Sequence, residues 1–131
     1  IDTLYDIFGK TRHEDSVSVC QKYALFPDLE DWKGKILLLE SSEEQPNPEK
    51  YRKMLKALKQ SGIFEVLSGV LVGKPMDERY AKEYQEILPE VIDNPSLPIV
   101  FNLNVGHATP RAIIPYGIMA KVDVSAQRIS F

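Results

Sequence analysis

The segment Gly34-Lys35-Ile36-Leu37-Leu38-Leu39-Glu40 has four consecutive apolar residues between polar neighbours. This pattern predicts a short strand over residues 36–39 that is buried on both faces. Similar apolar runs follow at residues 66–73 and 98–101, and turn-forming residues flank them. Three short buried strands of this kind are typical of a parallel sheet, so the fold class depends on what connects them.

Amphipathic helices are predicted between these strands. The sequence Asn47-Pro48-Glu49 supplies an N-cap residue, a proline at the first helical position and an acid in the first turn. A second helix is expected at residues 77–88, and Pro89 is expected to kink or divide it. Alternating strands and helices predict a parallel sheet with crossover connections. We expect the two crossovers to return the third strand beside the first.

The two ends of the chain complete the prediction. Residues 1–9 have apolar side chains at helical spacing, whereas residues 10–35 favour loops and one short element. Residues 112–124 and 127–131 are hairpin-like. The predicted fold class is therefore α/β, with parallel strands and crossover helices ending in antiparallel strands, in a single domain over residues 1–131.

Composition excludes several classes of protein. The chain has 131 residues and a net charge of −3, with 16 Lys and Arg against 19 Asp and Glu, so no basic face for nucleic acid is expected. Its longest apolar stretch, residues 112–120, is far below the ~20 residues that span a bilayer, so we expect no membrane segment. The single Cys20 favours a reducing compartment. Because the chain opens at Ile1 without a methionine, it is expected to be a fragment.

Two residues fall where ligand sites of α/β folds usually lie, at the carboxyl ends of predicted strands. They are Glu40 and His107. A carboxylate beside a histidine fixes the imidazole tautomer and stabilises its protonated form, as general base catalysis requires. Two plainer interpretations stay open, namely a solvated charge at Glu40 and a structural role for His107.

Other candidate functional residues have weaker support from the sequence. Cys20 lacks any helix-start signal or cation cluster that would lower its pKa, so it is interpreted as a small buried hydrophobe. The acidic pair Glu43-Glu44 can bind a cationic group, although a solvated loop is favoured. No serine-hydrolase elbow, phosphate-binding glycine loop or zinc motif is present, and the sequence implies no cofactor and no metal. A base and its orienting acid are thus predicted without a visible nucleophile.

The segments from Gly34 to Glu49, from Asn104 to Pro110 and Pro115-Tyr116-Gly117 together resemble the LD-carboxypeptidase family of serine peptidases. The loop after Glu40 looks most like the branch of microcin C immunity proteins, which hydrolyse the amide between a carboxyl-terminal aspartate and a nucleotide analogue. The resemblance covers essentially the whole chain and is to the carboxyl-terminal domain only, which in the family is a swivelling β/β/α domain.

The resemblance implies a function for the two candidate residues. In the family the amino-terminal domain supplies the nucleophilic serine and the oxyanion hole, and by motif position Glu40 and His107 are the other two members of the triad. The implied partners are that amino-terminal nucleophile domain, a peptide or aminoacyl-nucleotide substrate, and a second copy in a homodimer. The chain alone is expected to be inactive, and the implied location is cytoplasmic.

Two alternatives belong to other classes of protein. The sequence Gly106-His107-Ala108-Thr109-Pro110 is superficially similar to phosphohistidine carrier domains, which are also swivelling domains. A glutamate paired with the ring would oppose phosphorylation of the same imidazole. The third possibility is a binding or assembly module without chemistry of its own, whose apolar ends pack on a partner.

Overall fold

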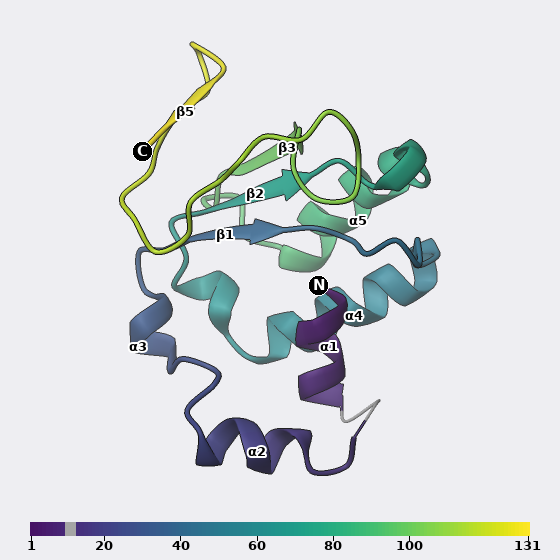
Figure 1. The fold of residues 1–131 in the computed structure, drawn as a ribbon, viewed down its shortest axis with the longest axis vertical. Coiled ribbons are helices and arrows are strands. Elements are labelled where there is room, and N and C mark those ends of the chain that lie inside the picture. The colour runs from purple at the N-terminus through teal and green to yellow at the C-terminus, as the bar shows by residue number, and fades with distance from the viewer. Residues whose placement is uncertain (10–12) are drawn as a thin grey trace.

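The centre of the molecule is a sheet of three parallel strands in the order β1-β2-β3 (Figure 1). The structure, a computed structural model, describes residues 1–9 and 13–131. In chain order its elements are α1 (Asp2–Gly9), α2 (Ser16–Lys22), α3 (Leu29–Trp32), β1 (Ile36–Leu39), α4 (Pro48–Gln60), the 3-10 helix η1 (Ile63–Glu65), β2 (Gly69–Gly73), the 3-10 helix η2 (Met76–Glu78), α5 (Ala81–Ile92), β3 (Ile99–Leu103), β4 (Lys121–Asp123) and β5 (Arg128–Ser130). The α/β class with parallel strands, crossover helices and an antiparallel ending is confirmed.

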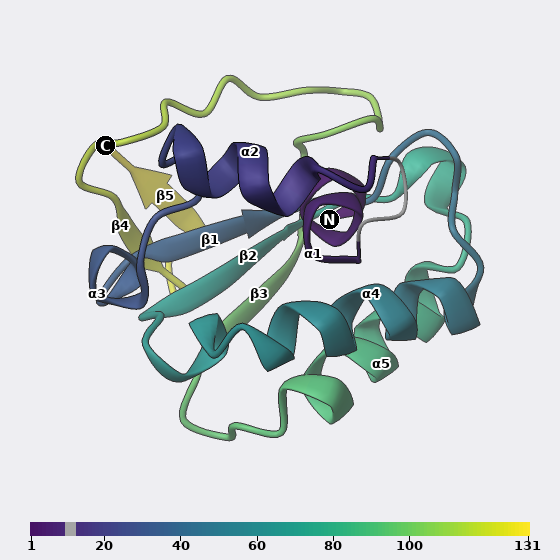
Figure 2. The ribbon, with the colours of Figure 1, turned by 90° about the horizontal axis from the view of Figure 1, so that it is seen from below.

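The order of the strands differs from the prediction. β2 pairs with both neighbours, with Leu37 of β1 beside Val70 and Val100 of β3 beside Leu71, so the third strand does not lie beside the first. The crossover helices α4 and α5 lie next to each other on one face of the sheet (Figure 2). Since parallel crossovers have one hand, two crossovers on the same face step in the same direction. The strands therefore follow sequence order.

Burial follows this order. All five residues of the central strand β2 are buried, as predicted for a strand covered on both faces. In β1 only Leu37 and Leu39 are buried, and most residues of β3 are half-buried, because both are edge strands. The core between the sheet and its helices includes these fully buried side chains: Tyr51, Leu55, Leu58, Ile63, Phe64, Leu88 and Ile92.

The crossover helices begin and end for local reasons. The Asn47 side chain accepts a hydrogen bond from the Lys50 amide at 2.8 Å, and Pro48 opens α4 as predicted. Pro89 does not divide α5, which continues to Ile92. Because Pro89 is exposed, the helix forfeits one internal hydrogen bond there and no core packing.

The N-terminal region packs around this core. The predicted helix at residues 1–9 is α1, which lies beside α4. In place of one short element, the region before β1 has two helices, α2 and α3. Trp32 at the end of α3 packs against the core, with its ring centroid 5.6 Å from that of Phe26.

The C-terminal region pairs less than expected. Of the two hairpin-like segments, only β4 and β5 pair, in antiparallel register. Residues 104–120 run from β3 back along the sheet as an irregular segment (Figure 1). Several of its apolar side chains are exposed, including Ile113 at 95% and Met119 at 88%. Within the described part of the chain, no helix is long and apolar enough to cross a membrane.

Candidate active site

Glu40 follows the last residue of β1 directly, so the strand carries it to the carboxyl edge of the sheet. Its side chain is half-buried there. The Ile1 nitrogen, directly before α1, donates to the Glu40 carbonyl at 2.8 Å. The first strand and the first helix thus fix the position of the carboxylate.

His107 reaches Glu40 through a loop that crosses the end of the central strand. At Gly73, the last residue of β2, a Cβ atom would lie 2.8 Å from the Val105 carbonyl oxygen. One residue further, Gly106 has φ +90°, and a Cβ atom there would overlap the Glu40 carboxylate. Gly73 favours glycine because the Val105 backbone passes where a side chain would stand, and Gly106 favours it because of its positive φ and the Glu40 side chain beside it. The loop therefore spans from β3 across β2 to β1.

The loop is closed behind His107. The Ala112 amide donates to the Asn104 carbonyl at 2.6 Å. The Arg111 guanidinium donates to the carbonyls of Ala108 at 3.3 Å and His107 at 3.4 Å. These bonds turn the segment back on itself and present the imidazole at the carboxyl edge of the sheet.

The structure brings the two predicted residues together. His107 Nδ1 lies 3.8 Å from Glu40 Oε2, within ion-pair range but beyond hydrogen-bond distance. The Nδ1 atom is buried and has no hydrogen-bond partner among the described residues. The expected proximity is therefore present without the close contact of an engaged acid and base.

A second carboxylate approaches the same ring from the other side. His107 Nε2 lies 3.0 Å from Glu43 Oε2, and the Glu43 side chain is 66% exposed. The sequence predicted a solvated loop at Glu43-Glu44, so this contact was missed. The available signal was that Glu43 follows Glu40 by three residues in the same loop, but no periodic pattern indicates where a loop side chain points.

These residues surround a small cavity of about 250 Å³, lined by Ile1, Asp2, Thr3, Glu40, Ser42, Glu43, Glu44 and His107. Ser42 is the serine in this lining, and its hydroxyl accepts from the Glu44 amide at 3.4 Å. Over residues 1–9 and 13–131, no group of three His, Cys, Asp or Glu side chains is placed to hold a metal ion. An imidazole beside a carboxylate can accept, hold and return a proton.

The loop that carries Glu43 is fixed at both ends. The Ser42 amide donates to Asp2 Oδ2 at 3.0 Å. The Gln45 side chain donates to Asp77 Oδ2 at 3.1 Å and accepts from Arg79 at 3.1 Å, and the Tyr84 hydroxyl donates to the Pro46 carbonyl. Glu43 lies between these attachments.

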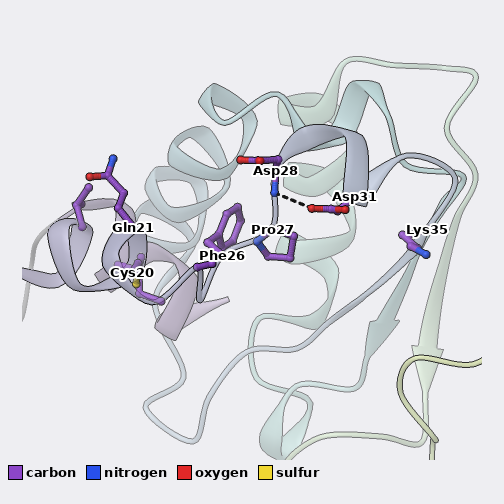
Figure 3. A pocket seen from close by; sticks show the side chains of 10 residues that line it. Cys20, Gln21, Phe26, Pro27, Asp28, Asp31 and Lys35 are labelled. Atoms are coloured by element: carbon purple, nitrogen blue, oxygen red, sulfur yellow. Dashed lines mark hydrogen bonds between the residues drawn. The ribbon is translucent and has the colours of Figure 1, made fainter.

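A larger cavity, of about 860 Å³, lies elsewhere in the molecule, between α1, α2 and the segment that leads to β1 (Figure 3). Cys20, Phe26, Asp28 and Asp31 are among its lining residues, whereas Glu40 and His107 are not. Cys20 is half-buried rather than buried as predicted, because its helix borders this hollow. The size of a cavity therefore does not identify the candidate site here.

Comparison with known proteins gives this geometry a context. The family model of the LD-carboxypeptidase C-terminal domain matches residues 15–122. A probable murein peptide carboxypeptidase of Bacillus subtilis (strain 168) is 25% identical over 100 residues, which are 72% of this chain and 31% of that protein. An MccF-like protein from Streptococcus pneumoniae, solved in complex with AMP, is 59% identical with a TM-score of 0.93.

The extent of these matches defines what is shared. The match to the Streptococcus pneumoniae structure covers 98% of this chain and 37% of that one, so the chain spans about a third of the length of these two relatives. The shared region contains the sheet, both crossover helices and the loop of His107. On the family match over most of its length, the chain belongs to the family of LD-carboxypeptidase C-terminal domains.

Proposed function

We propose that this chain is the carboxyl-terminal domain of a serine carboxypeptidase, in which His107 is the general base and Glu40 orients it. The observation that carries this proposal is the 3.8 Å approach of Glu40 Oε2 to His107 Nδ1 at the carboxyl edge of the sheet. Catalytic contacts in proteins without substrate are often longer than those of the reacting complex. The family of the chain supports the same assignment.

The proposed reaction is hydrolysis of an amide bond. A serine hydroxyl attacks the carbonyl carbon, and His107 takes its proton and returns it to the leaving amine, which leaves an acyl-serine ester. Water then attacks this ester, with His107 again taking and returning the proton, and the carboxylic acid and the free serine are released. Glu40 holds the ring with Nε2 toward the serine and stabilises the imidazolium. In this proposal residues 1–131 form one domain, and a separate nucleophile domain of the same protein supplies the serine and the oxyanion hole.

The exposed apolar surface of the chain supports docking of such a domain. The C-terminal segment exposes large apolar side chains, which favour burial against a partner surface. The same surface can serve a homodimer, which we include in the proposal. The single cysteine supports action in the reducing cytoplasm.

The proposed substrate class is an aminoacyl-nucleotide conjugate. This choice follows the MccF-like relative, whose structure holds AMP and whose identity to this chain is 59%. The Bacillus subtilis relative is named for murein peptides, but its identity is 25%. Murein peptides ending in a D-residue are therefore the second class to test.

A phosphohistidine carrier is not favoured by the geometry. Carboxylates lie 3.8 Å and 3.0 Å from the two ring nitrogens of His107, and negative charge at these distances opposes phosphorylation of the ring.

The test measures kcat/KM for an aspartyl-amide nucleotide and for an LD-tetrapeptide, using the longest polypeptide that contains this chain. His107→Ala and Glu40→Gln are expected to lower kcat/KM by at least about 10³-fold. Glu86→Gln, an exposed position on α5, is the charge-matched control and should retain the wild-type value.

Turnover of either substrate by residues 1–131 alone would contradict the assignment, because the proposed nucleophile lies outside them. Full activity of Glu40→Gln would also overturn it. The ratio of kcat/KM for the two substrates decides the substrate class.

A further inference from the structure

His107 is approached by two carboxylates, one at each ring nitrogen. The approach of Glu40 to Nδ1 is 3.8 Å, and Nδ1 makes no hydrogen bond to any described residue. The approach of Glu43 to Nε2 is 3.0 Å. The shorter contact is therefore at the nitrogen that the proposed mechanism needs free.

The two contacts favour different states of the ring. The negative charge of a carboxylate favours a proton on whichever ring nitrogen lies closer to it. Glu43 therefore favours a proton on Nε2. The base of the proposed triad needs the other tautomer, with the proton on Nδ1 toward Glu40 and a lone pair on Nε2. As long as Glu43 stays at Nε2, His107 cannot accept the proton of a nucleophile there.

Glu43 can leave without disturbing the rest of the loop. Its neighbours are fixed, since the Ser42 amide is bound to Asp2 and the Gln45 side chain is bound to Asp77 and Arg79. The Glu43 side chain itself is 66% exposed and can rotate into solvent. Ion pairs this exposed shift an equilibrium by no more than about fivefold. Substrate or a docking domain at the cavity can therefore displace it.

We propose that Glu43 is a positioning residue that holds His107 in a resting tautomer and is displaced from Nε2 when the site is occupied. The proposal rests on the function proposed above, since it assigns Nε2 to the nucleophile. The proposal gives the two carboxylates opposite effects. Removing Glu43 favours the Nδ1-protonated tautomer that the mechanism needs, whereas removing Glu40 takes away the carboxylate that holds this tautomer.

The direct test is the ¹⁵N NMR spectrum of the imidazoles in this chain. The chain has two histidines, and His13 is exposed, so it provides an internal reference. Spectra at about pH 8.5, well above the ordinary histidine pKa of about 6.5, report which nitrogen carries the proton. For His107 we expect the Nε2-protonated tautomer in the wild type and a shift toward the Nδ1-protonated tautomer in Glu43→Gln. Glu86→Gln should give the wild-type spectrum.

The kinetic test uses the longest polypeptide that contains the chain. Glu43→Gln should lower KM by about two- to fivefold with kcat unchanged, because the substrate no longer has to displace a carboxylate from Nε2. A KM that does not fall, or a wild-type ring already protonated on Nδ1, would overturn the role of Glu43. Failure of the proposed function has a different signature, which is undiminished activity of Glu40→Gln.

Discussion

Gly106 is the residue at which the site is most sensitive to a single added atom. Its φ of +90° disfavours any residue with a Cβ atom, and that atom would overlap the Oε2 of Glu40. Gly117 has a similar φ of +75° but has no neighbouring atom within 4 Å of the position of a Cβ. Comparing Gly106→Ala with Gly117→Ala therefore separates backbone strain from the contact with Glu40.

The expected magnitudes follow from this comparison. Left-handed backbone costs a residue with a Cβ atom about 1–2 kcal/mol. Alanine also reduces the conformational entropy of the unfolded chain relative to glycine, which offsets about 0.4–1 kcal/mol of this cost. The net loss for Gly117→Ala is then about 0–1.6 kcal/mol. Gly106→Ala must also push Glu40 from its rotamer, which adds about 0.5–1.5 kcal/mol. Its total loss is about 0.5–3 kcal/mol, limited because the half-exposed Glu40 can move aside.

Urea unfolding, followed by the fluorescence of the single Trp32, measures both losses. The His107 ring resonances should change in Gly106→Ala, because Glu40 has moved, and stay unchanged in Gly117→Ala. Equal stabilities of the two variants with an unaltered His107 signal would refute the close approach of the loop to Glu40. A loss beyond about 4 kcal/mol in Gly106→Ala would show that backbone, rather than the Glu40 side chain, had been displaced.

Three further predictions concern the fold around the site. Leu55→Ala, in the fully buried face of α4, should lower the free energy of unfolding by about 2–5 kcal/mol in urea, and a loss below 1 kcal/mol would contradict the packing of α4 on the sheet. Tyr84→Phe removes the donor to the buried Pro46 carbonyl and should cost about 1–3 kcal/mol. Burial raises the pKa of Tyr84 to about 12, so the stability that its protonated hydroxyl contributes is complete below pH 10 and is lost as the pH rises through 12. The alkaline loss of stability should therefore be smaller in Tyr84→Phe than in the wild type, and equal losses would refute this linkage. The hydrogen bond from Arg52 lowers the pKa of Glu90 below its ordinary value of 4.5. The stability difference between the wild type and Glu90→Gln should therefore be present at pH 7 and vanish as the pH falls below 4.5 through the lowered pKa. A difference that persists in acid would argue against the ion pair.

The sequence predicted those parts of the fold that depend on neighbouring residues. The apolar run before Glu40 placed this residue at the end of a strand, and Asn47 with Pro48 marked the start of α4, because caps and buried runs act over a few residues. The start of α5 was predicted too early. Asp77 and Tyr80 adopt positive φ, which side-chain patterns do not reveal, and the helix begins only at Ala81.

The strand order and the contact of Glu43 could not be predicted in the same way. Strand order depends on which face each crossover helix covers, and both α4 and α5 are amphipathic enough for either face of a sheet. The direction of Glu43 depends on the bonds of Ser42 and Gln45 to residues far along the chain. Long-range contacts of this kind leave no periodic signal in the sequence.

Glu40 and His107 were expected to meet because β1 and β3 were expected to be neighbours, yet they meet although β2 separates these strands. The loop after β3 achieves this by crossing the end of β2 at Gly73 and reaching β1 at Gly106. Neither glycine has chemistry of its own, and a Cβ atom at either position would meet atoms across the crossing. Here the acid after one edge strand and the histidine after the other form a pair because the loop passes closely over the end of the strand between them. We therefore attribute the assembly of the site to these two glycines as much as to the two side chains that would carry the proton.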